Sequence, residues 1–263
     1  MTTSSSRWPV GVLVVFCVMA VFSQAVAFAQ LRVMTSGGFA APLKAALPDF
    51  EKSTGISVSV VLGKSQGSGP DTIAAQLGRG VAADVVILSR EGLNDLITAN
   101  RIVAKSDVDL AKTPLGLAVK AGSPKPDISS VEAFKTALLH ARSITYPSST
   151  TGIYMVTKLF PQLGIDKDVA AKSSNAGIAA VAKGEAEIAI QPVSELLHVP
   201  GTDFVGALPQ QIQYISVFAA ARVANSSQDQ QAGQLIGFLA SQKAAAAIRD
   251  SGMEPLQAST SRR

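Results

Sequence analysis

The sequence contains very little of the side-chain chemistry on which many enzymes depend. Its single cysteine, Cys17, lies in an N-terminal apolar stretch, and the only histidines in 263 residues are His140 and His198. This set provides neither a disulfide framework nor the cysteine and histidine ligands of a zinc site. A G-x-x-x-x-G-K-[ST] phosphate loop is also missing. We therefore expect no metal site and no cofactor.

Aromatic residues and clusters of basic residues are also scarce. Aromatic side chains make up 5% of the chain, and the formal net charge of +4 is spread along the sequence without a Lys/Arg cluster. A nucleic-acid surface needs a basic stripe with rings on which bases stack. The composition thus argues against a nucleic-acid partner.

The first 29 residues have the layout of a secretory signal peptide. Arg7 supplies a positive charge, an apolar run follows from 10 to about 22, and "AFA" at 27–29 has the pattern of a cleavage site. The run is shorter than the roughly 20 residues of a spanning helix. We predict cleavage after Ala29 and release of a soluble periplasmic protein. An uncleaved N-terminal anchor is the alternative.

In the rest of the chain, short β-branched or apolar runs alternate with helical patterns. This alternation is typical of a mainly parallel α/β sheet flanked by helices. The predicted strands lie at 31–35, 56–63, 83–89, 113–122, 143–147, 186–191 and 211–223. The predicted helices lie at 39–55, 71–80, 91–100, 130–141, 148–164, 177–185 and, as one or two helices, 230–252.

Four predicted strands end in small, hydroxyl-bearing loops that lead into helices: "MTSGGF", "GKSQGSGP", "YPSSTTG" and "IQPVSE". The carboxyl ends of parallel strands lie at one edge of a sheet, where ligands bind in open α/β folds. Helix N-termini at this edge present free N–H groups and a partial positive charge. Serine and threonine also cap helices for purely structural reasons. Four such loops in one chain nevertheless favour a site for an anion or a polar ligand.

The segment 63–67 fits G-x-S-x-G, the motif that presents the nucleophilic serine of an α/β-hydrolase. Only about two strands and one helix of the exported chain precede Ser65, fewer than that fold requires. Its base would have to be His140 or His198, and a solvated or capping role accounts for both. We expect Ser65 to hold a ligand or to lie beside a residue that does. An exported serine hydrolase is the less favoured alternative.

Five segments spread over 33–255 carry a family resemblance. They are "VMTSGGFAAPLKAALPDFEKSTGISVSVVLG", "IAAQLGRGVAADVVILS", "YPSSTTGIYMVTKLF", "VAKGEAEIAIQPVSELL" and "FLASQKAAAAIRDSGMEP". With them the chain resembles the type II periplasmic solute-binding proteins of ABC importers, and among these the molybdate-binding proteins. The resemblance implies two lobes, each a mainly parallel sheet flanked by helices, which close on a ligand by a hinge motion. Lobe 1 would comprise 30–112 plus 218–255 and lobe 2 113–217, with 256–263 as a flexible tail.

The resemblance also implies which residues bind the ligand. In this family uncharged donors at helix starts hold a tetrahedral oxyanion, which suits the physics of helix N-termini. The corresponding positions here are Ser36, Gly37, Gly38, Ser65, Ser68, Thr150, Thr151, Asn175, Ala176 and Gln191. Gly38 and Gln191 stand where the family has hydroxyl donors. A small organic anion or a polar solute therefore stays open beside molybdate or tungstate.

The expected function is that of a solute-binding protein without enzymatic activity. The resemblance implies that it acts as a monomer and delivers its ligand to the membrane subunits of an ABC importer. A sensory or scaffold protein with the same fold is a further alternative.

Overall fold

The structure is a computed structural model, and it describes residues 1–2 and 30–256. Nearly all of the predicted signal peptide and of the predicted tail therefore lies outside the described residues. Within these ranges, every helix is too short or too polar to span a bilayer.

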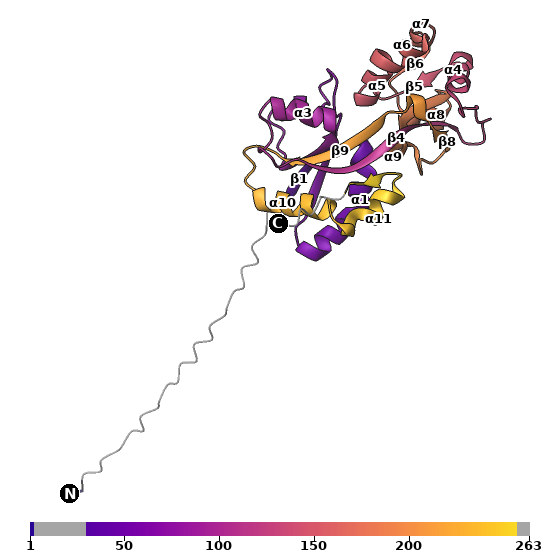
Figure 1. The fold of residues 1–263 in the computed structure, drawn as a ribbon. Coiled ribbons are helices and arrows are strands. Elements are labelled where there is room, and N and C mark those ends of the chain that lie inside the picture. The colour runs from indigo at the N-terminus through magenta and orange to yellow at the C-terminus, as the bar shows by residue number, and fades with distance from the viewer. Residues whose placement is uncertain (3–29, 257–263) are drawn as a thin grey trace.

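The sheet is organised around one long strand, β4 (Val108–Lys120). Its first half pairs antiparallel with β9 (Ile215–Arg222), and its second half pairs antiparallel with β7 (Ile188–Pro192) and β8 (Thr202–Ala207). The sheet has the order β2-β1-β3-β9-β4-β7-β5-β6, and β8 and β10 also pair with β4. One strand thus belongs to both halves of the molecule, and β4 and β9 run between them (Figure 1).

The first lobe contains the start and the end of the chain. Its strand β3 is buried along its whole length, as a strand covered by helices on both faces must be. Its elements are β1 (Leu31–Ser36), α1 (Gly37–Thr54), β2 (Val58–Gly63), α2 (Ile73–Gly78), β3 (Val85–Ser89), α3 (Arg90–Thr98), β9, α10 (Asp229–Leu239), α11 (Gln242–Asp250) and β10 (Glu254–Pro255).

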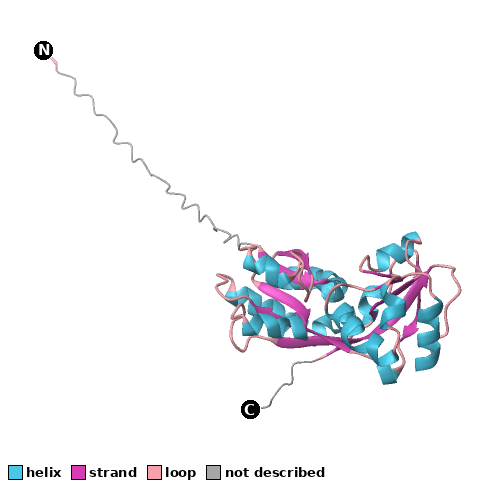
Figure 2. Cartoon of the chain, turned by 90° about the horizontal axis from the view of Figure 1, so that it is seen from above, coloured by secondary structure: helices cyan, strands magenta, loops and turns pink. Residues whose placement is uncertain are grey.

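The second lobe is formed by the middle of the chain and is separated from the first in the view from above (Figure 2). It contains one π-helical segment, η1, and one 3₁₀ turn, η2. Its elements are α4 (Val131–His140), β5 (Ile144–Thr145), α5 (Thr150–Tyr154), η1 (Met155–Leu159), α6 (Phe160–Leu163), α7 (Asp166–Ala170), β6 (Ser173–Ser174), α8 (Ile178–Lys183), β7, α9 (Val193–Leu196), β8 and η2 (Gln210–Ile212).

The hydrophobic core is divided in the same way as the sheet. The clusters around Phe39 and Phe50 draw only on 31–111 and 218–253, whereas the clusters around Phe134 and Phe160 draw only on 115–212. Two separately packed lobes are what a hinged two-lobe α/β fold requires, so the predicted fold class is confirmed. This division of the core agrees with the predicted lobe bounds, which remain a proposal.

Several elements differ from the sequence-based predictions: β4 begins at Val108 rather than 113, and the short elements α7, β6, α9 and β10 were not predicted. Three further differences have a clear physical reason. Strand β8 was not predicted, because its half-buried segment "TDFVGA" lacks a clear alternation. The helix expected within 148–164 is interrupted by η1, where the hydrogen bonding widens to the π pattern. The strand expected from 211 begins only at Ile215, because Gln213 turns its side chain back to bond the backbone of Leu115.

A buried carboxylate joins three segments of the first lobe. Asp84 is fully buried and accepts hydrogen bonds from the backbone N–H and guanidinium of Arg32, from Ser226 and from Gln228. Burial alone would raise the pKa of Asp84, but the hydrogen bonds from Arg32 and Ser226 outweigh it, and the pKa is lowered from 3.8. The carboxylate form therefore stabilises the fold above that value.

We expect Asp84→Asn to lower the free energy of unfolding at pH 7 by about 2–4 kcal/mol, because it removes a charge-assisted network. Since the folded pKa is depressed, this contribution is lost as the pH falls below 3.8. The difference between the two proteins in urea unfolding should therefore shrink as the pH falls from about 4 toward 2. Glu254→Gln, which breaks an exposed ion pair with Lys112, is the matched control and should cost less than about 1 kcal/mol. A difference that stayed constant with pH would contradict this role of Asp84.

Candidate functional site

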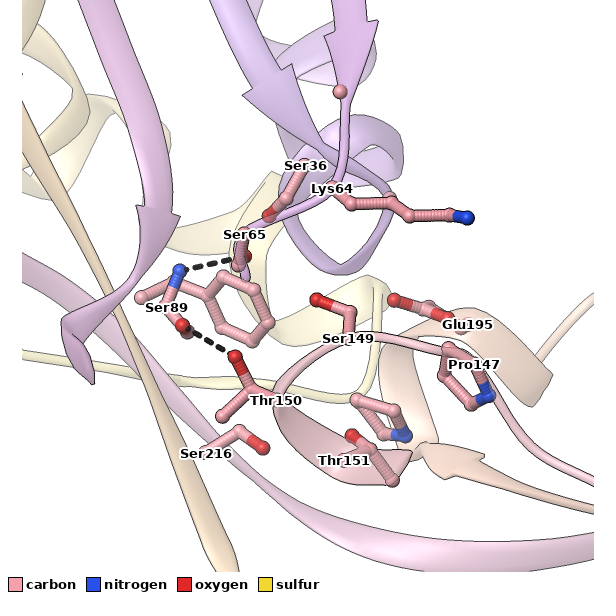
Figure 3. Close-up of a pocket in the computed structure, with 14 residues that line it drawn as sticks. Ser36, Lys64, Ser65, Ser89, Pro147, Ser149, Thr150, Thr151, Glu195 and Ser216 are labelled. Carbon is pink, nitrogen blue, oxygen red and sulfur yellow. Dashed lines mark hydrogen bonds between the residues drawn. The ribbon is translucent and has the colours of Figure 1, made fainter. Parts of the chain in front are cut away.

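A cavity of about 140 Å³ lies between the two lobes. The residues around it come from loops at strand ends and from β9, and most are shown in Figure 3. From the first lobe they are Ser36, Gly37, Gly63, Lys64, Ser65, Ser89, Ser216 and Phe218, and from the second Pro147, Ser149, Thr150, Thr151, Pro192 and Glu195. A volume of this size suits a small ligand, since a cavity of about 150 Å³ accommodates benzene.

Sheet register brings these loops together. In the parallel pair β1–β2, Ser36 lies opposite Gly63, so the loops after the two strands start side by side. In the antiparallel pair β3–β9, Ser89 lies opposite Phe218. The lining residues of the first lobe are therefore neighbours through backbone pairing, although they are far apart in the sequence.

Hydroxyl and amide groups join the two lobes across the cleft. Ser89 Oγ and Thr150 Oγ1 are 2.8 Å apart, and Thr150 Oγ1 donates to Gln66 Oε1 at 3.0 Å. Because a hydroxyl has one proton to donate, Ser89 must be the donor to Thr150. The N–H of Gln66 donates to Ser149 Oγ at 3.2 Å, which adds a second contact between the lobes. These bonds hold the lobes in a closed arrangement.

Ser36 provides an unused hydrogen-bonding group at the cavity. It is 4% exposed, and its Oγ has no hydrogen-bond partner among the described residues. It is the N-cap residue of the 18-residue helix α1, yet its side chain makes no capping bond. A buried hydroxyl without a partner costs free energy. At the positive end of a long helix it is positioned to donate to an anion.

The cavity is lined by two charged side chains with different surroundings. Lys64 is half exposed and pairs with Asp71 at 3.0 Å, so its charge is largely compensated. Glu195 lies in α9, directly after β7, and its Oε2 accepts a hydrogen bond from Gln191 Nε2. Burial raises the pKa of Glu195 to about 7, and the bond from Gln191 lowers it only in part. Glu195 thus changes its protonation state near neutral pH.

Half of the predicted ligand-binding residues line the cavity. They are Ser36, Gly37, Ser65, Thr150 and Thr151. Gly38 and Gln191 do not line the cavity, but each is next in sequence to a residue that does. A Cβ at Gly38 would lie 2.1 Å from the Phe218 ring, so glycine is needed there.

Three predicted residues are not brought to the cavity. Ser68, Asn175 and Ala176 are exposed and lie outside its lining, and the Asn175 side chain bonds the backbone of Tyr146 instead.

Sequence reasoning missed Glu195 and Ser89, although both follow the strand-loop-helix pattern that marked the other loops. Glu195 ends the quoted loop "IQPVSE", and Ser89 ends "VVILS" before a helix. The family resemblance implied a ligand held by neutral donors, and this gave no reason to expect a carboxyl in the site. No histidine lines the cavity, and Ser65 Oγ accepts the N–H of Ser89 at 3.0 Å. Ser65 therefore lacks the base that a serine nucleophile requires.

Two α/β lobes with a hydroxyl-lined cleft between them define a binding protein of the hinged, two-lobe class. The chain belongs to the family of bacterial extracellular solute-binding proteins, whose model matches residues 31–254. It is also 38% identical over 232 residues to a protein from Pseudomonas sp named aconitate isomerase, which covers 87% of this chain and 88% of that protein.

Solved structures of two-lobe binding proteins share the fold. The periplasmic molybdate-binding protein of Azotobacter vinelandii superposes with a TM-score of 0.66 at 18% identity, covering 87% of this chain and all of that one. A periplasmic thiamin binding protein superposes with a TM-score of 0.67 at 19% identity, covering 88% and 84%. The predicted family resemblance is therefore confirmed. At such identities the likeness concerns the fold alone.

We expect Ser36→Ala to leave the free energy of unfolding unchanged or to increase it by up to about 1 kcal/mol, since the substitution removes an unpaired buried hydroxyl. Ser130→Ala is the matched control. Ser130 accepts a capping bond from the N–H of Ala133, and its loss should cost about 1 kcal/mol. Both values are measurable by urea unfolding of the ligand-free protein. A loss of 1 kcal/mol or more in Ser36→Ala would mean that this hydroxyl supports the fold rather than a ligand.

Proposed function

We propose that this protein binds a small organic acid with more than one carboxylate in the inter-lobe cleft, outside the cytoplasm. We further propose that it isomerises an unsaturated acid such as aconitate. The observation that carries the proposal is a titratable carboxyl, Glu195, in the wall of a cavity whose other lining residues, apart from the paired Lys64, are uncharged. The proposal is supported by the 38% identity to a protein named aconitate isomerase over most of both chains.

The neutral donors suit carboxylate groups. Ser36 offers a free hydroxyl at the start of α1, and the N-termini of α1 and α3 contribute partial positive charge. Carboxylates accept several hydrogen bonds and need no ion pair when such donors are fixed in place. A ligand with two or three carboxylates can contact the loops of both lobes at once and so favour the closed arrangement.

A tetrahedral oxyanion such as molybdate is the alternative with less support. An ionised Glu195 acts against every anion, molybdate and carboxylates alike, so its charge does not separate the two kinds of ligand. Gly38 and Gln191 lack the hydroxyls that this family uses for such ligands. The likeness to the molybdate-binding protein is one of fold, at 18% identity.

The family to which the chain belongs consists of extracellular proteins. We propose that a signal peptide directs the chain to the periplasm. There it would either deliver the acid to the membrane subunits of an ABC importer or convert it in place. Conversion is favoured by Glu195 and by the name of the relative, whereas delivery alone gives this carboxyl no task.

Thermal unfolding of residues 30–263 with a panel of anions tests the proposal. The panel contains cis-aconitate, trans-aconitate, the saturated analogue tricarballylate, molybdate and sulfate. A ligand at 100 times its dissociation constant adds about 2.7 kcal/mol of stability. For a chain of this length the midpoint should rise by about 5–10 °C.

We expect the tricarboxylates to raise the midpoint and molybdate and sulfate to leave it unmoved. Ser36→Ala should bind the tricarboxylates at least about tenfold more weakly, because it removes a donor to a carboxylate, and Ser130→Ala should bind them like the parent protein. A shift with molybdate but none with the tricarboxylates would replace this proposal by the oxyanion alternative.

A further inference from the structure

Glu195 is surrounded by groups that leave its carboxyl free to act on a ligand. The lining residue Lys64 is paired with Asp71, and the causes of the pKa shift of Glu195 are burial, which raises the pKa, and the amide of Gln191, which lowers it. Packed against α9 are α1, β4, β7 and β8. The carboxyl and the first turn of α1 thus face the same cavity (Figure 3).

The start of α1 determines what lies next to this carboxyl. A Cβ at Gly37 would lie 3.3 Å from Glu195 Oε1, so the absence of a side chain keeps Oε1 open toward the cavity. Ser36, one residue earlier, provides the unpaired hydroxyl and the helix N-terminus. When a ligand carboxylate binds at this N-terminus, the ligand carbon atoms next to that carboxylate come to lie beside Glu195 Oε1.

From this juxtaposition we propose that Glu195 is the catalytic residue that removes a proton from a carbon atom of the bound unsaturated acid and returns it at another. The inference rests on the proposed function. The Glu195 carboxylate takes the proton from the CH₂ group, that C–H bond breaks, and its electron pair spreads through the double bond into the carboxylate. The resulting carboxylic acid gives the proton to the other end of the three-carbon system. The double bond shifts by one position, and Glu195 is again a carboxylate.

During this step, negative charge moves away from Glu195 and toward groups that stabilise it. The negative charge leaves Glu195 and develops on the ligand carboxylate, at the positive end of α1 and beside Ser36 Oγ. Fixed donors aimed at developing charge stabilise a transition state more than the ground state. One carboxyl is enough for both transfers, and the step needs no oxidant, reductant or metal ion.

Gln191 is the positioning residue for this exchange. Its Nε2 donates to Glu195 Oε2, and its own Oε1 is buried without a partner. When Glu195 Oε1 carries the transferred proton, Oε2 is a carbonyl-like oxygen that still accepts from Nε2, so this bond persists through the exchange. Gln191 therefore complements both protonation states of Glu195.

Conversion of cis-aconitate in D₂O, followed by NMR, tests the inference. We expect the parent protein to form trans-aconitate with deuterium at carbon. General acid–base catalysis contributes about 10²–10⁴-fold, so Glu195→Gln should slow the conversion at least 100-fold. Calorimetry should show that this variant binds cis-aconitate at least as tightly as the parent, because the amide has the same shape and carries no negative charge to repel the ligand. Glu195→Asp should keep part of the rate.

The pH dependence separates a chemical role from a structural one. In the parent protein kcat/KM should rise with pH through a midpoint near the pKa of about 7 and then level off, because the carboxylate form accepts the proton. The bond from Gln191 lowers this pKa, so Gln191→Met should move the midpoint upward. A merely structural role of Gln191 would lower the rate without moving the midpoint.

The outcomes distinguish the inference from the proposed function. If cis-aconitate binds but the parent protein neither converts it nor exchanges its protons, the role of Glu195 is wrong and the binding function stands. If Glu195→Gln converts it within threefold of the parent rate, another group transfers the proton and the inference is overturned. If no tricarboxylate binds, the proposed function itself fails.

Discussion

The whole arrangement depends on the double pairing of β4. Because this strand pairs with β9 in the first lobe and with β7 and β8 in the second, both sheets share one continuous backbone path. The strand-end loops of the two lobes are therefore held at one cleft while their hydrophobic cores remain separate. Separate cores allow the lobes to move, and the shared strand limits that motion to a hinge.

What the cleft can bind depends on the small number of charged side chains that line it. Hydroxyls and helix N-termini line most of it, Lys64 is neutralised by Asp71, and Glu195 is the one ionisable group whose surroundings favour its neutral form. A partly buried carboxyl in such a cavity differs from the same carboxyl on an open surface, since each change of its charge alters its interaction with a bound anion. Under the proposed function, binding and proton transfer share this one cavity.

The sequence predicted most of the fold and half of the proposed site. Alternating strands and helices and the four hydroxyl-bearing loops are local patterns, and the loops containing Ser36, Ser65 and Thr150 do reach the cavity. Glu195 was not predicted, because its pKa is raised by burial in the folded protein, against the lowering effect of the bond from Gln191, and no local pattern reveals such burial. Ser68 and Asn175 were expected in the site but lie outside it, since their exposure depends on how the loops turn. Strand β8 was missed because a half-buried strand has weak alternation.

The chain of bonds from Ser89 through Thr150 to Gln66 has a consequence for how the cleft opens. Its members are hydroxyls and amides, so the lobes are held together across this seam without an ion pair. Dissolved ions screen charges, but they weaken hydrogen bonds between neutral groups far less. The rate at which the cleft opens to a solute should therefore change little from dilute to saline surroundings, which suits a member of an extracellular family.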